Sequence, residues 1–310
     1  MSPVILFSAG AERFEVYAEP LRDALRAAGV SPRVVTEAAP EEVDYIVVAP
    51  GSGITDFGPY TRCKAVLSLW AGVERMVGNP TLTQPLCRMV DTALEAGMVE
   101  YVTGHVLRHH LGMDRFINRP LTGWEAGVPP LASERPVAML GLGALGRACA
   151  RALTELGFPV LGWSRSPRDV AGIACHHGAE GLAEVLGRAQ IVVTLLPLTP
   201  QTENLIDAAA LARVPQGAVL INPGRGALID DDALLAALER GHIGHATLDV
   251  FRTEPLPEDH PYRTHPHVTV TPHIAAATRP ETASRVIAEN VRRGEAGEPF
   301  LHLVDRDRGY

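Results

Sequence analysis

A glycine pattern near the middle of the chain could bind the diphosphate of a nucleotide. The segment VAMLGLGALG contains Gly141, Gly143 and Gly146 at the spacing GxGxxG, after an apolar run and before a helical pattern. The first glycine permits a tight turn, the second lets the main chain approach a diphosphate, and the third lets helix and strand pack closely. We predict a dinucleotide-binding loop, with Ala144 and Leu145 among its contacts. The alternative is a glycine-rich turn without a ligand.

The strand after this loop ends in residues suited to a phosphate group. It reads VLGWSRS from Val160, where an NAD site usually places Asp or Glu near Ser164. A carboxylate would repel a 2′-phosphate, whereas the Arg165 guanidinium between two hydroxyls would bind it through charge-assisted hydrogen bonds. We therefore predict NADPH over NADH, with Trp163, Ser164, Arg165 and Ser166 as contacts. The alternative is a solvated Arg165 and the use of both cofactors.

Three further polar groups follow the ends of predicted strands. They carry Arg225 in NPGRG, Asp249 and Glu254 in DVFRTEP, and His273 in TPHIA. Ligands bind at the carboxyl ends of the strands in open parallel sheets, so each group lies where chemistry is expected. Periodicity alone leaves open whether the three groups converge.

Strand and helix patterns alternate along the chain and must position these groups. Apolar runs at Val4–Ser8, Asp44–Ala49 and Ala65–Leu69 predict buried strands, and a Pro- and Gly-rich segment follows at Asn118–Pro136. A second series of strands is predicted at Val137–Leu140, Val160–Trp163, Ile191–Leu196, Ala218–Asn222, Ala246–Val250 and Val268–Thr271. Apolar strands alternating with helices predict an α/β fold with parallel, doubly wound sheets.

Composition excludes several classes of function. The chain has 310 residues, of which 46% are hydrophobic, and a formal charge of −8, which argues against a nucleic-acid partner. The apolar runs fall far short of the roughly 20 residues of a membrane span. The four cysteines lack metal-ligand spacing, so we expect free thiols and no metal. The N-terminus lacks a basic signal-peptide region, and we expect a cytoplasmic protein.

Taken together, the motifs resemble those of the D-2-hydroxyacid dehydrogenase family and, within it, the glyoxylate/hydroxypyruvate reductases. The resemblance covers nearly the whole chain and rests on GLGALG, LLPLTPQT, NPGRG, DVFRTEP, TPHIAAATRPE and the terminal DRDRGY. It implies a flavodoxin-like substrate domain at 1–98 plus 275–310, a Rossmann cofactor domain at 99–274, and a cleft between them. It also implies a homodimer, formed by a connecting helix at Gly97–Leu111 and an arm at 115–130. Trp124 either belongs to this arm or packs locally.

The same resemblance assigns Arg225, Glu254 and His273 as the catalytic set. Arginine offers a bidentate fork to the planar carboxylate of a 2-oxo acid. His273, as an imidazolium, would donate a proton to the carbonyl oxygen while hydride reaches the carbonyl carbon. Glu254 would orient the ring and favour its charged form. The implied reaction is NADPH-dependent reduction of small 2-oxo acids, glyoxylate and hydroxypyruvate first.

Further contacts follow from the resemblance. Trp70, Ala71 and Gly72 match a loop whose amides bind the substrate carboxylate, although relatives more often carry glycine at position 70. An indole there could narrow the pocket, stack on a substrate side chain or point into the core. Asp249 would accept a hydrogen bond from the nicotinamide carboxamide. The remaining implied cofactor contacts are Leu196, Pro197, Thr202, Pro223, Gly224 and His273.

Two other functions remain open. Trp70 would suit a larger aryl or branched 2-oxo acid, such as phenylpyruvate. A dinucleotide-sensing binding protein would not need the three charged residues, all of which are present here.

Overall fold

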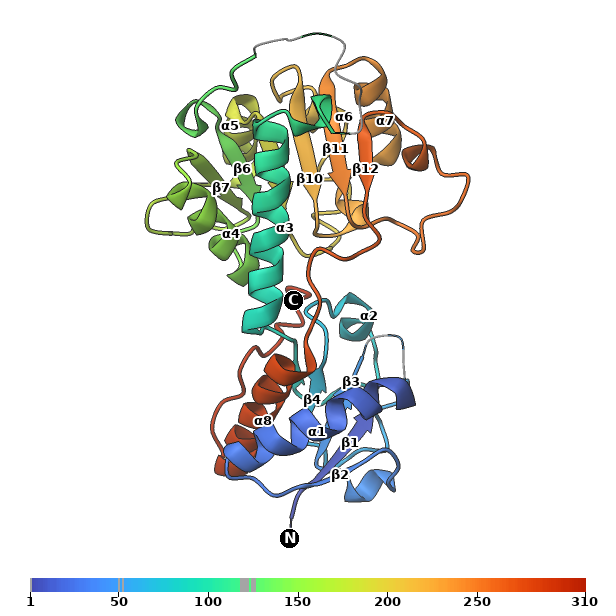
Figure 1. Cartoon of the computed structure of the whole chain (residues 1–310). Helices are drawn as coiled ribbons and strands as arrows, with labels where there is room; N and C mark the ends of the chain where they lie inside the picture. Colours follow the sequence, from blue (N-terminus) through green and yellow to red (C-terminus); the bar gives the residue numbers. More distant parts are fainter. Residues whose placement is uncertain (1, 50, 52, 118–122, 124–126) are drawn as a thin grey trace. The chain divides into compact units, whose positions relative to one another are not determined.

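The computed structural model describes residues 2–49, 51, 53–117, 123 and 127–310 and divides into two compact units (Figure 1). Unit 1 comprises Met1–Leu94 and Ala277–Tyr310, and unit 2 comprises Glu95–Ala276. Both are built on parallel sheets, which confirms the predicted α/β class. The functional roles predicted for the two domains remain predictions.

Unit 1 is built on a five-stranded sheet. The strand order is β2-β1-β3-β4-β5, and every pair is parallel, as in flavodoxin-like folds. The strands are β1 (Val4–Ser8), β2 (Arg33–Val35), β3 (Tyr45–Val48), β4 (Ala65–Ser68) and β5 (Leu86–Cys87). The helices are α1 (Ala11–Ala27), α2 (Glu74–Val77) and α8 (Pro280–Ala296), with a 3-10 turn at η1 (Pro40–Glu42).

Alternation along β1 divides the core of unit 1 between the two faces of its sheet. Ile5 and Phe7 pack with α1 and α8, while Leu6 packs with residues near α2 on the opposite face. Apolar side chains therefore cover both faces, which explains the continuous apolar strands of the sequence.

Unit 2 contains a seven-stranded parallel sheet in the order β12-β11-β10-β9-β6-β7-β8. Its strands are β6 (Val137–Leu140), β7 (Val160–Ser164), β8 (Ala174–His177), β9 (Ile191–Thr194), β10 (Ala218–Asn222), β11 (Ile243–Leu248) and β12 (Val268–Val270). The strand order reverses direction between β6 and β9, which is the point where ligands bind in doubly wound sheets.

Helices cover both faces of this sheet, as Figure 1 shows for α3 in front of it. The α-helices are α3 (Thr92–His110), α4 (Ala144–Glu155), α5 (Gly178–Arg188), α6 (Ala208–Leu211) and α7 (Asp231–Glu239). Short 3-10 turns occur at η2 (Met113–Arg115), η3 (Ala132–Glu134), η4 (Gly226–Leu228) and η5 (Pro261–Arg263). Val137 and Met139 pack with α3 and α4, whereas Ala138 and Leu140 pack with α5, α6 and α7.

The connecting helix was predicted to begin at Gly97, but α3 begins at Thr92. The Asp91 carboxylate accepts hydrogen bonds from the amides of Ala93 and Leu94, at 2.9 and 3.1 Å. An aspartate in this place satisfies amides that have no partner within the helix, so it sets the helix start upstream of the apolar periodicity.

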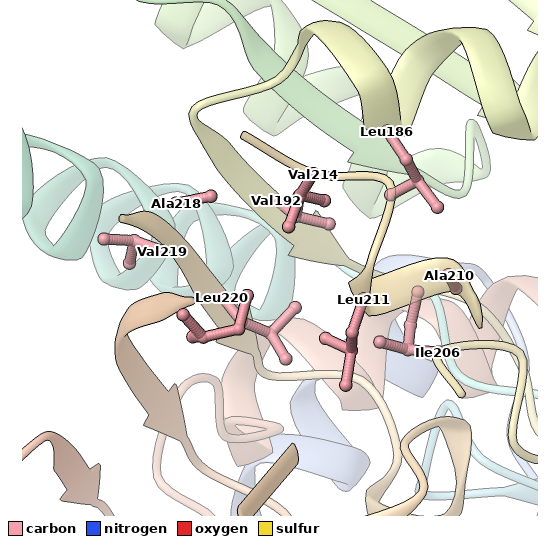
Figure 2. A pocket seen from close by; sticks show the side chains of 10 residues that line it. Leu186, Val192, Ile206, Ala210, Leu211, Val214, Ala218, Val219 and Leu220 are labelled. Atoms are coloured by element: carbon pink, nitrogen blue, oxygen red, sulfur yellow. The ribbon is translucent and has the colours of Figure 1, made fainter. Parts of the chain in front are cut away.

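The core of unit 2 contains a small apolar void of about 10 Å³ between α5, α6 and the sheet (Figure 2). Leu186, Val192 and Leu211 are among the side chains that line it. A void of this size holds at most one water, and an apolar lining offers that water no hydrogen bond. We therefore regard the void as a packing defect and not as a ligand site.

Three observations bear on the composition-based expectations. The four cysteines are unpaired, as predicted, and Cys63, Cys87 and Cys149 are buried. Among the described residues, none of the helices has the length and apolar character that crossing a membrane requires. In the same part of the chain, no three His, Cys, Asp or Glu side chains gather as they would around a metal ion.

Candidate active site

The glycine loop has the backbone geometry of a diphosphate site. Gly141 has a φ of 111°, and a Cβ there would lie 2.4 Å from the carbonyl oxygen of Leu195. A Cβ at Gly146 would lie 1.8 Å from the oxygen of Gly141, so only glycine permits this approach of α4 to the loop. A Cβ at Gly143 would meet nothing within 4 Å. Open space at Gly143, in front of the N-terminus of α4, fits an anionic group.

The predicted phosphate-binding residues lie at the carboxyl end of β7. Arg165 and Ser166 are exposed, and the Ser164 hydroxyl donates to the carbonyl oxygen of Ser166 at 2.8 Å. Trp163 is different: its side chain is 5% exposed, and its Nε1 donates to the oxygen of Gly178 at 2.9 Å. Because side chains alternate along a strand, the indole faces the core. The indole is therefore placed away from the surface, and the predicted cofactor contact of Trp163 remains a prediction that its main chain would have to meet.

The three charged groups follow three adjacent parallel strands. β10, β11 and β12 are neighbours in the sheet, with Asn222 opposite Leu248 and Leu248 opposite Val270. Arg225 follows β10, Glu254 lies in the loop after β11, and His273 follows β12. The fold therefore brings all three groups to the same edge of the sheet, and the convergence of Arg225 with the other two remains a prediction.

His273 and Glu254 form a direct pair. His273 Nδ1 lies 2.8 Å from Glu254 Oε2, and the second carboxylate oxygen accepts the Phe251 amide at 2.9 Å. The carboxylate is thereby oriented by its own loop, and the imidazole is oriented by the carboxylate. A carboxylate on Nδ1 makes that nitrogen the donor and directs Nε2 toward a reacting group. The pair has the composition of a general acid with its orienting partner.

The backbone of His273 adopts a left-handed conformation. Its φ is 54°, which costs a residue with a side chain about 1–2 kcal/mol. The His273 amide donates to the main-chain oxygens of Asp249 and Thr271, at 2.9 and 3.0 Å. This sharp turn sends the imidazole back toward the Glu254 loop.

Asp249 is fully buried beneath that turn. Its Oδ1 accepts the amide of Ile274 and its Oδ2 accepts the amide of Ala275, each at 2.9 Å. Its Oδ1 also accepts the Thr271 hydroxyl at 2.5 Å. The nicotinamide contact of Asp249 remains a prediction, and the sequence did not indicate these partners. The TPHIA motif alone does not indicate that its amides bond Asp249.

Arg225 is held at the start of η4. Asn222 Nδ2 donates to its carbonyl oxygen at 2.9 Å, and its own Nη1 donates to the oxygen of Gly224 at 2.7 Å. Pro223 and Gly224 are buried, and a Cβ at Gly224 would lie 2.8 Å from the oxygen of Thr194. The NPGRG motif therefore packs one strand end against the next.

The predicted cofactor contacts after β9 form a compact turn. The Thr202 hydroxyl is buried and donates to the oxygen of Pro197 at 2.7 Å, while Leu196 and Pro197 are partly exposed. Thr202 therefore shapes the loop, and the side chains of Leu196 and Pro197 line its surface.

The Trp70 loop belongs to unit 1 and follows β4. Trp70 is 39% exposed, with the Arg13 guanidinium 5.6 Å from its ring centre, so the alternative that it points into the core is wrong. The Ser68 hydroxyl bonds both the amide and the oxygen of Trp70, which fixes the turn before Ala71 and Gly72. Their assignment as substrate contacts remains a prediction. Trp124 lies outside the described residues.

Comparison with known proteins places these features in a family. The sequence model described as "D-isomer specific 2-hydroxyacid dehydrogenase, NAD binding domain" matches residues 105–275. The chain is 40% identical over 257 residues to glyoxylate/hydroxypyruvate reductase A of Serratia proteamaculans, covering 80% of this chain and 82% of that protein. It is 38% identical over 255 residues to the protein of the same name from Yersinia enterocolitica, with the same coverage.

Solved structures show the same similarity. A D-isomer specific 2-hydroxyacid dehydrogenase from Xanthobacter autotrophicus Py2, in complex with NADPH and MES, has a TM-score of 0.91 and 39% identity. An NADPH-dependent glyoxylate/hydroxypyruvate reductase from Sinorhizobium meliloti, in complex with NADP and sulfate, has a TM-score of 0.84 and 33% identity. Each comparison covers 100% of both chains.

Proposed function

Because the chain belongs to the D-isomer specific 2-hydroxyacid dehydrogenase family, it is an NAD(P)-dependent oxidoreductase, and we propose that it reduces small 2-oxo acids with NADPH. Glyoxylate and hydroxypyruvate are the substrates we expect, because relatives at 37–40% identity carry these names. The observation that carries the proposal is the 2.8 Å contact between His273 and Glu254 at the edge where Arg225 also lies.

The chemistry follows from the residue types. Arg225 binds the carboxylate of the 2-oxo acid through its guanidinium fork and fixes the ketone beside it. The glycine loop before α4 would hold NADPH, which would supply the hydride for the ketone carbon. His273 donates its Nε2 proton to the oxygen on which negative charge develops. Glu254 accepts from Nδ1 and holds the ring in place while the proton moves.

NADPH is the cofactor that the strand end after β7 fits. Ser164, Arg165 and Ser166 present one cation and two hydroxyls, and no carboxylate stands at these positions. A 2′-phosphate would accept from the Arg165 guanidinium and the Ser166 hydroxyl, and from Ser164 if its hydroxyl turned away from the Ser166 oxygen. The Xanthobacter and Sinorhizobium relatives hold NADPH and NADP, which supports the same preference here.

We also propose that the chain forms a homodimer. Six large apolar side chains in the stretches of chain that follow α3 in the sequence are exposed. They are Leu111, Met113, Phe116, Ile117, Val128 and Leu131. Exposed apolar side chains gathered in one segment are typical of an interaction surface. Sedimentation equilibrium tests the proposal: a mass of twice the chain supports it, and a monomer at micromolar concentration refutes it.

A matrix of initial rates tests the proposed activity. Purified protein is incubated with NADPH or NADH and one of glyoxylate, hydroxypyruvate and phenylpyruvate, and absorbance loss of the reduced cofactor is recorded. We expect the highest kcat/KM with NADPH and one of the two small acids. A preference for phenylpyruvate would favour the larger-substrate alternative, which the exposed Trp70 suggests. Cofactor binding without turnover of any acid would favour a sensing protein.

A further inference from the structure

A chain of hydrogen-bonded side chains runs from α3 to the turn that carries His273. The Tyr101 hydroxyl lies 2.8 Å from Thr271 Oγ1, which lies 2.5 Å from Asp249 Oδ1. A carboxylate only accepts, so the single proton of Thr271 points to Asp249. Thr271 must then accept the proton of Tyr101. The direction Tyr101 to Thr271 to Asp249 is therefore determined by the donor inventory.

Burial keeps the Tyr101 hydroxyl protonated, so it can donate to Thr271. Burial is the largest cause that raises the pKa of Tyr101 to about 12. The hydroxyl thus retains its proton throughout the neutral range, and the hydrogen bond to Thr271 persists.

The Asp249 carboxylate extends this chain to two successive amides, and the Asp249 main chain bonds the amide before them. The His273 amide bonds its main-chain oxygen, and the amides of Ile274 and Ala275 bond its two carboxylate oxygens. Successive amides that converge on an anion around a left-handed residue form a nest. The nest stabilises the unfavourable φ of His273, and the φ decides where the imidazole points.

We propose that Tyr101 and Thr271 are positioning residues that hold the His273 imidazole in its reactive orientation through Asp249. This inference rests on the proposed function, because it concerns the proton donor of that reaction. Tyr101 bonds Thr271, and Thr271 bonds the Asp249 carboxylate, so both hydroxyls act on the turn through that carboxylate.

The expected effect of replacing Thr271 follows from the two hydrogen bonds that Asp249 Oδ1 accepts. With Thr271 replaced by valine, this fully buried oxygen keeps the Ile274 amide and loses its hydroxyl partner. A buried charge with an unmet acceptor position moves toward other donors or water. Because the carboxylate spans both amides, its movement loosens the turn and displaces the ring from Glu254.

The test compares Thr271→Val and Tyr101→Phe with a matched control, Thr269→Val. Thr269 lies two residues earlier on β12 and bonds Arg108 and His245, outside the chain to Asp249. We expect Thr271→Val to lower kcat roughly 10- to 100-fold, because a misplaced catalytic group costs about that much. Tyr101→Phe removes one hydrogen bond further out and should lower kcat about 3- to 10-fold. In both variants KM for the 2-oxo acid should change less than about threefold, since Arg225 is untouched.

Amide hydrogen exchange supplies a readout that does not depend on turnover. In Thr271→Val we expect the Ile274 and Ala275 amides to exchange about 10-fold faster, and in Thr269→Val we expect wild-type exchange there. Thr271→Ser should restore both kcat and protection. The proposal is overturned if Thr271→Val and Tyr101→Phe both keep wild-type kcat, or if Thr269→Val loosens the two amides equally. Should wild-type protein reduce no 2-oxo acid, the proposed function fails, while the exchange comparison still decides whether the chain holds the turn.

Discussion

Replacing Glu254 with glutamine tests the orienting role that we propose for its carboxylate and leaves His273, the proposed proton donor, in place. The glutamine keeps the size of the side chain but has only one accepting oxygen. In the native protein, one carboxylate oxygen accepts from the Phe251 amide and the other from His273 Nδ1. The carboxamide of Glu254→Gln can be placed in two ways. Its NH2 group either faces the Phe251 amide, which then has no acceptor, or faces His273 Nδ1. In the second case Nδ1 must accept, and the doubly protonated ring is disfavoured.

The magnitude follows from the exposure of the pair. A hydrogen bond to a charged group contributes about 1.5–3 kcal/mol when buried, but the side chains of His273 and Glu254 are 54% and 35% exposed. Solvent screening brings the contribution to about 1 kcal/mol. This corresponds to about a fivefold loss of kcat.

Steady-state rates across pH provide the assay, with saturating NADPH and glyoxylate. Glu258→Gln is the matched control, since Glu258 is an exposed carboxylate in the same loop. We expect Glu254→Gln to lower kcat about fivefold at neutral pH and the control to retain wild-type rates. Equal kcat and an unchanged pH profile in Glu254→Gln would refute the role assigned to the carboxylate.

Three further predictions address the cofactor loop and stability. Gly146→Ala should lower Tm by several degrees, because its Cβ would lie 1.8 Å from the oxygen of Gly141. Gly143→Ala should keep the wild-type Tm and lose NADPH affinity, because its Cβ would enter the open space in front of α4. A normal Tm in Gly146→Ala by calorimetry, with normal NADPH affinity in Gly143→Ala by titration, would count against the loop assignment. Arg165→Glu should weaken NADPH binding about 100-fold and NADH binding less than about threefold, since only NADPH carries the 2′-phosphate, and equal losses measured by fluorescence titration would contradict the predicted contact. Burial is the largest cause that lowers the pKa of His109 to about 3, so between about pH 6.5 and 3 the unfolded chain binds a proton that the folded chain does not. Lowering the pH from 7 to 5 should therefore reduce the free energy of unfolding by about 2 kcal/mol through this residue. The urea midpoint of the wild-type protein should fall over this pH range, and that of His109→Gln should fall less.

The sequence could predict features that depend on local pattern. Gly141, Gly143 and Gly146 follow β6 and open α4 as expected, because a tight turn and close packing demand glycine within a few residues. Apolar runs likewise predicted the central strands. They missed β2, β5 and β8, which are short strands at or near sheet edges with two to four residues. Short strands carry little periodicity, so tertiary pairing determines them.

Contacts distant in sequence were beyond prediction. Tyr101 and Thr271 are separated by 170 positions, and neither differs in type from an ordinary helix or strand residue. The burial of Asp249 also differs from the prediction, because a motif aspartate at a strand end was expected to face a ligand. The role of each of these residues depends on hydrogen-bond partners from other helices and strands, and a single sequence does not show which residues become partners.

The most direct test of the account compares wild-type protein with His273→Asn, because asparagine tolerates the left-handed backbone conformation at this position. NADPH binding and glyoxylate reduction are measured on the same samples. We predict equal NADPH affinity and a loss of kcat of about 10²- to 10⁴-fold in the variant, as expected for removal of a general acid. A His273→Asn protein that reduces glyoxylate at the wild-type rate would contradict the account.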